Sequence, residues 1–316
     1  MTDQPVGDGQ PAQEEVLLGE RRQLLNLAYR LLGSLSDAED VVQEAYARWY
    51  AMSRPDREAV VSPGAWLTTV AGRICLNVLS SARVRRETYV GEWVPEPVPE
   101  PTEWLGGRAN GAPGDPADRI TLDESVSMAF LVVLDAMTPA ERVAFVLHDV
   151  FRYSFPEVAE IVGRTPGACR QLASSARRRI RAARAPVTPT TDQARIVRAF
   201  RLAWEAQDIE AVVGLLAPDV RATSDGGGRV RTVLRPVVGV GRILRSFAAL
   251  ADRFRGQTLL ERTVNGQPGL VAQRDGVTVS VYAFEVVDDR ITHIWAIRNP
   301  DKLRSWTAGG AVAGPG

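Results

Sequence analysis

Apolar residues recur at helical spacing across the first part of the chain, from residue 14 to about residue 86. Gly33 is expected to end a strongly apolar first helix, because glycine tolerates the left-handed backbone that follows many helices. Ser36 and Glu39 have the spacing of a capping box, which predicts the start of a second helix. Ser62, followed by a proline, predicts the start of a third. The pattern therefore predicts a helical module.

A stretch rich in proline and glycine interrupts this pattern from residue 94 to 118. Such a composition favours an extended, partly stiff linker without a core of its own. Helices are expected again from about Arg119. Thr138 and Glu141 form another capping-box pair, at the start of an apolar helix.

Residues 154–184 predict two helices joined by a tight turn. Ser154 and Glu157 cap the first helix, and Gly163 suits the position just after its end. Thr165 is an expected N-cap, because a proline follows it. This arrangement is typical of a helix-turn-helix unit that enters the DNA major groove.

The second helix of this pair separates apolar from basic residues. One predicted stripe holds Ala168, Leu172, Ala176, Ile180 and Ala183. The outward side is predicted to hold Arg170, Ser174, Arg177, Arg178, Arg181 and Arg184. Arginine neutralises phosphates and reads guanine, so this side predicts a DNA-binding face. A solvated arginine helix on an ordinary bundle is the open alternative.

The pattern changes after a short linker at residues 185–191. Amphipathic helices are expected at 194–216 and 240–254, and strands at 220–223, 230–234, 258–264, 277–287 and 290–298. Asp275-Gly276 and Asp288-Asp289 predict hairpin turns. Helices followed by a strand meander indicate an α+β domain with its helices on one face of a curved sheet.

Charge is unevenly distributed, although 38 basic and 38 acidic residues give a net charge of zero. Residues 138–184 carry nine Arg and four acidic residues, a net +5, whereas residues 90–136 carry two Arg and nine acidic residues, a net −7. Cys75 and Cys169 lack the spacing of a zinc site, and we see no leader or membrane-spanning run. We therefore expect a cytoplasmic protein without a metal site or a membrane partner.

Two helical modules joined by a linker, with a helix-turn-helix in the second, resemble a bacterial sigma factor of the extracytoplasmic-function type. The segment 37–46 is similar to the helix by which this family grips the β′ clamp helices of RNA polymerase. The resemblance implies polymerase contacts at Asp37, Glu39, Asp40, Gln43 and Glu44. A basic partner surface would be attracted to these acidic residues. An acidic first turn that merely suits the helix dipole is the alternative.

The same resemblance implies two DNA-binding segments. The segment 63–67 and the residues after it are similar to the part that melts the −10 element, with contacts at Trp66, Arg73, Asn77, Arg83, Arg85 and Arg86. Trp66 also lies at apolar spacing and so suits a core position. The helix 165–184 would read the −35 element through Arg170, Gln171, Ser174, Arg177 and Arg178.

Three further motifs resemble the subgroup of these sigma factors that carries a fused C-terminal SnoaL-like domain. They are YVGEWVPEP at residues 89–97, DGGGR at 225–229 and NPDKL at 299–303. The resemblance implies a built-in regulator that packs on the sigma module and the linker. Its expected interdomain residues are Trp93, Pro95, Glu96, Pro97, Asp225, Gly226, Gly227, Gly228, Asn299, Pro300, Asp301, Lys302 and Leu303. Lys302 is also the single lysine of the chain.

Two alternative functions remain open at this point. Cone-shaped domains of this type often bury a small apolar ligand, and Asp225 and His293 are candidates for acid–base catalysis. Such a ligand-binding or isomerase-type activity would be coupled to DNA binding. Asp225 nevertheless lies in a glycine-rich turn, which favours a solvated side chain, and His293 suits a packing or hydrogen-bonding role. A one-component transcription factor with a ligand sensor would not need the polymerase-gripping helix.

We therefore predict a multidomain protein with two all-α sigma modules and an α+β SnoaL-like, NTF2-like cone-shaped domain. The expected boundaries are 14–90 for sigma region 2, 91–118 for the linker, 119–185 for sigma region 4 and 192–306 for the regulatory domain. The expected partners are core RNA polymerase, through its β′ clamp helices and β flap, and promoter DNA. We expect no cofactor and no catalytic residue, with a small apolar ligand in the C-terminal domain as an open possibility.

Overall fold

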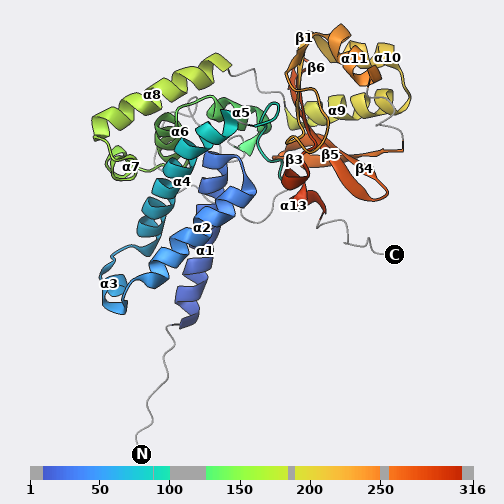
Figure 1. The fold of residues 1–316 in the computed structure, drawn as a ribbon. Helices are drawn as coiled ribbons and strands as arrows, with labels where there is room; N and C mark the ends of the chain where they lie inside the picture. The colour runs from blue at the N-terminus through green and yellow to red at the C-terminus, as the bar shows by residue number, and fades with distance from the viewer. Residues whose placement is uncertain (1–9, 88, 100–125, 184–188, 250–255, 308–316) are drawn as a thin grey trace, which may run out of the picture. The chain divides into compact units, whose positions relative to one another are not determined.

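The computed structural model describes residues 10–87, 89–99, 126–183, 189–249 and 256–307 (Figure 1). Contacts divide the described chain into two compact units. The first unit contains residues 10–80 and 137–177, and the second contains residues 81–99, 126–136 and 178–307 apart from the gaps just given. The connection after the first sigma module and the helix at 128–135 thus group with the C-terminal part of the chain.

The first unit is helical. Its helices are α1 (Gln10–Leu32), α2 (Leu35–Ala51), α3 (Arg54–Ala59), α4 (Pro63–Glu87), α6 (Pro139–Phe145), the π-helical turn η3 (Val146–Val150), α7 (Phe155–Val162) and α8 (Pro166–Ala183), of which α4 and α8 continue into the second unit. Gly33 has a φ of 67° directly after α1, as the sequence predicts. The predicted cap of α2 is wrong by two residues, because Ser34 accepts the hydrogen bond from the Asp37 amide at 3.2 Å.

The short helix α3 was not expected from the sequence. Ser53 caps it by accepting a hydrogen bond from the Asp56 amide, and Arg54 pairs with Glu58 at 2.7 Å. None of its residues is buried, so no apolar stripe marks it in the sequence. Local capping and an i,i+4 ion pair define this helix instead of core packing.

The helix-turn-helix forms as predicted. Capping boxes join Thr138 to Glu141 and Ser154 to Glu157, and Gly163 turns the chain with a φ of 70°. The predicted apolar stripe of α8 is shifted, however. Its buried residues are Cys169, Ala173, Ala176 and Ile180, whereas Ala183 is exposed and Ala168 and Leu172 are half-buried. Cys169 lies outside the predicted stripe, although a buried free cysteine packs as a small apolar residue.

The second unit contains a six-stranded sheet in the order β2-β1-β6-β5-β4-β3. The strands are β1 (Leu216–Asp225), β2 (Val237–Val238), β3 (Thr258–Val264), β4 (Gln267–Arg274), β5 (Val277–Val287) and β6 (Arg290–Ile297). β1 and β6 run parallel, and the other neighbours run antiparallel. The helices are α5 (Met128–Asp135), α9 (Thr190–Glu205), α10 (Ile209–Leu215), α11 (Val240–Ala249), the 3-10 turn η4 (Pro300–Lys302) and α13 (Arg304–Thr307).

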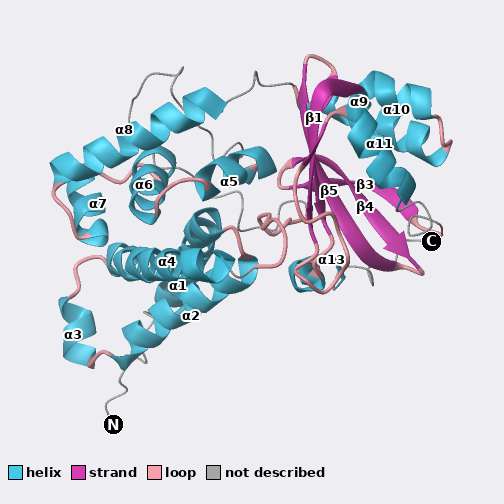
Figure 2. Cartoon of the chain, turned by 45° about the horizontal axis from the view of Figure 1, so that its top comes forward, coloured by secondary structure: helices cyan, strands magenta, loops and turns pink. Residues whose placement is uncertain are grey.

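Both faces of the sheet are covered by apolar side chains. Helices α9, α10 and α11 pack on one face through residues such as Phe200, Val212 and Ile243 (Figure 2). The other face meets the linker, α5 and the C-terminal helix α13, through Val94, Met128 and Trp306 among others. The strands contribute apolar side chains to both clusters, because neighbouring residues of a strand point to opposite faces of the sheet.

Two of the predicted elements of this unit are wrong. The helix expected at 194–216 is two helices, because Gln207 adopts a φ of 57° and Asp208 caps α10 by accepting from the Ala211 amide at 2.9 Å. The strand expected at 230–234 does not form, and the short β2 pairs with β1 instead. Residues 250–254 of the second predicted helix lie outside the described residues.

Strand β4 was missed in the sequence. It follows a tight turn at Asn265-Gly266, where both residues have positive φ angles of 52° and 71°. Gly269 lies where an added Cβ would come within 2.6 Å of the Tyr282 carbonyl oxygen, so close packing requires glycine there. The glycine and a proline within the strand hide the alternation that reveals a strand. The predicted turns at Asp275-Gly276 and Asp288-Asp289 both show the expected positive φ angles.

Among the described helices, none combines the length and the apolar character that a membrane crossing requires.

Candidate functional site

Helix α2 presents an acidic face opposite its buried side. Its buried residues are Ala38, Val41, Val42, Ala45 and Trp49. Of the predicted polymerase contacts, Asp37 is half-buried, and the exposed residues are Glu39, Asp40, Gln43 and Glu44. Glu44 also pairs with Arg48 one turn later. The face therefore offers a cluster of solvent-accessible carboxylates that a basic surface can approach.

The predicted −10 residues on α4 differ in their environments. Trp66 is half-buried, and its ring lies 5.3 Å from the ring of Trp49, so it packs in this unit as well as reaching its surface. Arg73 and Asn77 are exposed, and Arg73 donates a hydrogen bond of 2.9 Å to the Glu160 carbonyl oxygen on α7. The side chains of Arg83, Arg85 and Arg86 lie outside the described residues.

Helix α8 keeps most of its predicted DNA-binding residues accessible. Arg170, Gln171 and Arg178 are exposed, and Ser174 is half-buried. Arg177 departs from the prediction of a free outward residue, because its guanidinium forms an ion pair of 2.6 Å with Asp149. Arg184 lies outside the described residues. Three of the five residues predicted to contact the −35 element are therefore exposed, namely Arg170, Gln171 and Arg178.

In the second unit, Asp225 accepts hydrogen bonds from the segment 89–94. Its carboxylate accepts from the Tyr89 hydroxyl at 2.6 Å and from the Val94 amide at 3.0 Å. Asp225 is fully buried, so the prediction of a solvated turn residue is wrong. Burial, followed by the hydrogen bond to Asp225, raises the pKa of Tyr89 well above its ordinary value. The Tyr89 hydroxyl therefore remains a proton donor to this carboxylate.

Lys302 completes the same cluster from the other end of the domain. Its ammonium donates to Asp225 at 2.7 Å and also to the Val94 carbonyl oxygen. The ammonium lies 4.1 Å from the centre of the Trp93 ring and 5.5 Å from that of Tyr89. Carboxylate, carbonyl and aromatic faces thus surround a buried cation, which is the environment that a desolvated ammonium needs. We call Tyr89, Trp93, Val94, Asp225, Asn299 and Lys302 the linker lock.

The three glycines after Asp225 allow this close approach. Gly227 has a φ of 61°, its amide donates to Asp225, and an added Cβ would lie 2.4 Å from the Asn299 side chain. At Gly228 a Cβ would lie 3.2 Å from Val90. Asn299 in turn donates to the Tyr89 hydroxyl at 3.0 Å. Positive φ angles and close contacts with Asn299 and Val90 therefore require glycine at positions 227 and 228.

The linker is held at further points. The Trp306 indole donates to the Pro97 carbonyl oxygen at 2.8 Å, and Pro95, Glu96, Pro97, Val98 and Leu303 are buried. Pro300 is exposed and Asp301, which pairs with Arg229 at 3.1 Å, is half-buried. Residues 94–98 thus pack on the C-terminal domain, as the resemblance implies for the linker. Residues 100–118 of the predicted linker lie outside the described residues.

Asn265 binds two segments of the chain at once. Its side-chain oxygen accepts from the Val98 amide at 3.2 Å, and its side-chain nitrogen donates to the Val126 carbonyl oxygen at 3.0 Å. Its own amide donates to the Val98 carbonyl oxygen at 2.9 Å. Asn265 is fully buried at the β3–β4 turn. Sequence reasoning missed this residue and Trp306, and the unrecognised Asn-Gly turn was the signal that pointed to Asn265.

His293 has the packing role that its position suggested. Its imidazole hydrogen-bonds to the Thr223 hydroxyl at 2.9 Å and stacks on Trp295, with 4.1 Å between ring centres. Burial, and then the positive charge of Arg221, lower the pKa of His293 to about 4. The side chain is therefore neutral near pH 7.

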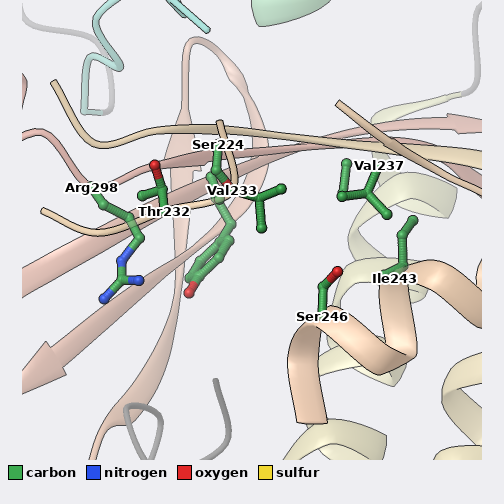
Figure 3. A pocket seen from close by; sticks show the side chains of 10 residues that line it. Ser224, Thr232, Val233, Val237, Ile243, Ser246 and Arg298 are labelled. Carbon is green, nitrogen blue, oxygen red and sulfur yellow. The ribbon is translucent and has the colours of Figure 1, made fainter. Parts of the chain in front are cut away.

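A pocket opens between the sheet and α11 in the same unit (Figure 3). It is lined by Ala222, Ser224, Thr232, Val233, Val237, Ile243, Ser246, Tyr282, Ala296 and Arg298. Neither Asp225 nor His293 belongs to this lining, so the two acid–base candidates do not face the pocket. The described residues contain no cluster of His, Cys, Asp or Glu suited to a metal ion.

Comparison with known proteins identifies the family. The sigma-70 region 2 family matches residues 18–85, and the sigma-70 region 4 family matches residues 127–180. The ECF RNA polymerase sigma factor SigJ of Mycobacterium tuberculosis H37Rv is 39% identical over 297 residues, which cover 90% of each chain. The chain belongs to the extracytoplasmic-function sigma factors.

Two further relatives span nearly the whole chain. The protein named "Probable ECF RNA polymerase sigma factor SigI" of Mycobacterium tuberculosis CDC 1551 is 34% identical over 294 residues, covering 92% of this chain and 95% of that protein. The crystal structure of SigJ from the same species matches with a TM-score of 0.71 and 34% identity, covering 92% of this sigma factor and 98% of that chain. The expected fold class, helical sigma modules followed by an α+β SnoaL-like domain, is confirmed.

Proposed function

We propose that this sigma factor binds core RNA polymerase through the acidic face of α2 and reads promoter DNA through α4 and α8. The exposed carboxylates of Glu39, Asp40 and Glu44 suit the basic surface of the β′ clamp helices. Arg170, Gln171 and Arg178 on α8 suit the −35 element, and Arg73 and Asn77 on α4 suit the −10 element. In the proposed arrangement region 4 also binds the β flap, with sigma-module boundaries at 14–90 and 119–185.

The C-terminal domain, proposed at 192–306, acts in this scheme as a fused regulator that holds the connection between regions 2 and 4. The observation that carries this proposal is the double contact of Asn265, with Val98 at one end of the connection and with Val126 at the other. A connection whose ends are tied to one side chain cannot extend, although the same number of residues in an extended chain would span many tens of ångströms. Regions 2 and 4 must reach separate promoter elements, so holding the connection closed opposes promoter binding.

The linker lock strengthens this hold. The bonds of Asp225 and Lys302 to Val94 fix the chain four residues before the Asn265 contact. Because the regulator is part of the same chain, its effective concentration at the linker is high, and modest contacts suffice. Release of the linker would shift the population toward a form that engages the promoter.

The test is promoter-dependent run-off transcription with core polymerase and full-length variants. Asn265→Gly removes both side-chain hydrogen bonds but keeps a residue that tolerates the positive φ. Asp275→Gly is the matched control, because Asp275 occupies the equivalent position of the next hairpin with a φ of 51°. We expect Asn265→Gly to raise promoter binding and transcript yield several-fold and Asp275→Gly to leave both unchanged. Equal yields for the two variants would rule out the closed-connection scheme.

A deletion tests the proposed regulatory role of the C-terminal domain by removing several contacts at once. Removal of residues 299–316 takes away Asn299, Lys302 and Trp306, and with them contacts to Tyr89, Val94 and Pro97. We expect promoter-dependent transcription to change, and an unchanged yield would argue against a regulatory role of the C-terminal domain.

An isomerase-type activity is not our proposal. Asp225 is fully engaged by Tyr89, Val94 and Lys302, and His293 hydrogen-bonds to Thr223 and stacks on Trp295. Neither group is placed to exchange a proton with a molecule in the pocket, because neither lines it. The relatives named above are sigma factors, which supports the same choice.

A further inference from the structure

The segment between α6 and α7 contains the π-helical turn η3. The Phe151 amide donates to the Val146 carbonyl oxygen at 3.0 Å, five residues back along the chain. Such turns insert one extra residue into a helix and are frequent at functional sites. Two consecutive side chains of this turn, those of His148 and Asp149, contact the helix-turn-helix. The turn is therefore joined to the proposed DNA-binding unit by side chains as well as by the backbone.

Both contacts lead to one flank of α8. The His148 ring stacks on Phe155 with 3.9 Å between ring centres, and the Arg170 guanidinium lies 5.2 Å from the centre of the same Phe155 ring. Arg177 follows Arg170 by about two helical turns, so the two arginines point to the same side of α8. Asp149 pairs with Arg177 and thus contacts the flank that also carries the exposed Arg170.

Asp149 holds Arg177 through two hydrogen bonds. The Nε and Nη2 atoms of Arg177 donate to the two carboxylate oxygens, at 2.6 and 3.3 Å. This bidentate contact orients the guanidinium and occupies donors that a phosphate could otherwise engage. The side chains of Arg177 and Asp149 are 34% and 15% exposed. The pair therefore cancels the charge of one arginine on this flank of α8.

The pair is costly to break because Asp149 is half-buried. Burial raises the pKa of its carboxyl, and the hydrogen bond and charge of Arg177, followed by the charges of His148 and Arg152, oppose that rise. A phosphate that engaged Arg177 would leave the Asp149 carboxylate without its bonded cation. A contact with the DNA backbone alone therefore gains little from Arg177, whereas an arginine without such a partner binds the phosphates of any sequence.

We propose that Asp149 is a specificity-determining residue, which keeps the charge of Arg177 from phosphates and so lowers the affinity of α8 for DNA of arbitrary sequence. This inference rests on the proposed assignment of α8 to the −35 element. Phosphate contacts supply most of nonspecific binding and carry no sequence information directly, so withholding one of them favours the specific complex. Recognition then depends on Arg170, Gln171 and Arg178, which remain exposed.

The test is fluorescence anisotropy of the full-length protein with a random-sequence DNA duplex at several salt concentrations. Asp149→Asn keeps an oxygen that can accept from Arg177 but removes the negative charge. We expect this variant to bind the duplex several-fold more tightly. The slope of log affinity against log salt should steepen by about 0.9, as for one added phosphate contact. Glu160→Gln removes the same charge from the exposed surface of α7, and this matched control should keep the wild-type slope.

Substitution of Arg177 tests whether the change comes from this guanidinium. Arg177→Gln in the otherwise wild-type protein should leave the salt slope unchanged, because the charge is already cancelled. The same substitution added to Asp149→Asn should return the steeper slope to the wild-type value. Equal slopes for wild-type protein, Asp149→Asn and Glu160→Gln would overturn the inference. A shallower slope for Arg177→Gln alone would also overturn it, because Arg177 would then neutralise a phosphate despite Asp149.

A promoter duplex and Arg170→Ala separate this inference from the proposed function. We expect Asp149→Asn to lower the ratio of promoter affinity to random-duplex affinity, and an unchanged ratio would refute a role in specificity. If Arg170→Ala weakens DNA binding while Asp149→Asn behaves like Glu160→Gln, the inference about Asp149 fails and the assignment of α8 stands. If neither Arg170→Ala nor Asp149→Asn alters binding to either duplex, the assignment of α8 to DNA fails as well.

Discussion

At the scale of single residues, Lys302 is a buried cation whose contacts must replace the water that its ammonium loses. Its ammonium is buried with Asp225, the Val94 carbonyl oxygen and the Trp93 ring. A buried ion pair adds little over a well-packed apolar pair, but removing one partner leaves an uncompensated charge. Removal of Lys302 is therefore expected to cost more stability than the attraction within the ion pair contributes. Arginine, which the chain uses for its other 37 basic residues, has a larger, planar head that suits this compact site less well.

Replacement of Lys302 by methionine should destabilise the protein strongly. We expect the free energy of unfolding to fall by about 3–5 kcal/mol, because Asp225 stays buried without its cation. Urea unfolding followed by tryptophan fluorescence measures this change. Arg304→Met, whose side chain is 69% exposed, is the control and should shift stability by less than about 0.5 kcal/mol. Similar stabilities for the two variants would contradict the importance of the buried pair.

His293 predicts a component of acid destabilisation. Its pKa of about 4 in the folded protein lies below its ordinary value of 6.5, so folding favours the neutral imidazole. This contribution is complete above pH 6.5 and is lost as the pH falls toward 4. Arg221 and Glu285 are its charged cross-strand neighbours. We expect the stability difference between wild-type protein and His293→Gln to shrink from pH 7 to pH 4.5 in urea titrations, and a constant difference would contradict the shifted pKa.

At the scale of elements, the proposed function assigns DNA to the basic helix α8 and core polymerase to the acidic helix α2. Arg170 is exposed on α8, with its guanidinium 5.2 Å from the centre of the Phe155 ring, so the side chain is held near one orientation. We expect Arg170→Ala to weaken promoter DNA binding by about 1–3 kcal/mol and to reduce its dependence on salt. Fluorescence anisotropy at several salt concentrations measures both. Arg262→Ala on β3 should change neither, and an unaltered affinity for Arg170→Ala would remove this residue from the DNA interface.

The acidic face of α2 should respond to charge reversal. Asp40 is exposed and lies opposite the buried side of the helix, so Asp40→Lys changes the surface without disturbing the core. We expect this variant to bind core polymerase less tightly, mainly through slower association, because charge complementarity steers encounter. Association kinetics with immobilised core enzyme test this, with Glu210→Lys on the exposed surface of α10 as the control. Equal association rates for both variants would exclude α2 from the interface.

Elements with local signals were predictable from the sequence, and those fixed by distant contacts were not. The capping boxes at Thr138 and Ser154 and the turn at Gly163 depend on neighbouring residues, and all three are confirmed. Strand β4 was missed because its glycine and proline serve close packing against neighbouring strands. The local sequence pattern does not indicate which strands will pack against β4.

The same distinction applies to the site. The three motifs at 89–97, 225–229 and 299–303 pointed to one group of residues, and the structure brings Trp93, Asp225 and Lys302 together. The burial of Asp225 was not predictable, because its partners Tyr89 and Val94 lie more than 130 residues away in the sequence. From sequence alone, a glycine-rich turn is expected to be solvated, because the segment that covers it lies far away in the sequence.

At the scale of the whole molecule, the C-terminal domain contacts the connection between the sigma regions, on which we propose that it acts as a regulator. The described part of the connection, residues 89–99, has backbone or side-chain bonds to Asp225, Asn265, Lys302 and Trp306. These bonds come from three places in the C-terminal domain: the end of β1, the β3–β4 turn and the segment after β6. Opening of the linker must therefore break several contacts together, which makes it a cooperative local transition.

Proteolysis can measure this transition directly. Thermolysin cleaves before apolar residues, and the Trp93–Val94 bond is protected while Val94 is buried and hydrogen-bonded. We expect Asn265→Gly and Lys302→Met each to accelerate cleavage at this bond by about tenfold or more, because cleavage follows the population of the open form when opening is fast. Asp275→Gly should be cleaved at the wild-type rate, because the contacts that hold residues 94–98 come from Asp225, Asn265, Lys302 and Trp306. If Lys302→Met accelerates cleavage and Asn265→Gly does not, the lock alone holds the linker and the double contact of Asn265 is dispensable. If neither variant is cleaved faster, the linker stays bound without either contact, and the proposed release mechanism is excluded.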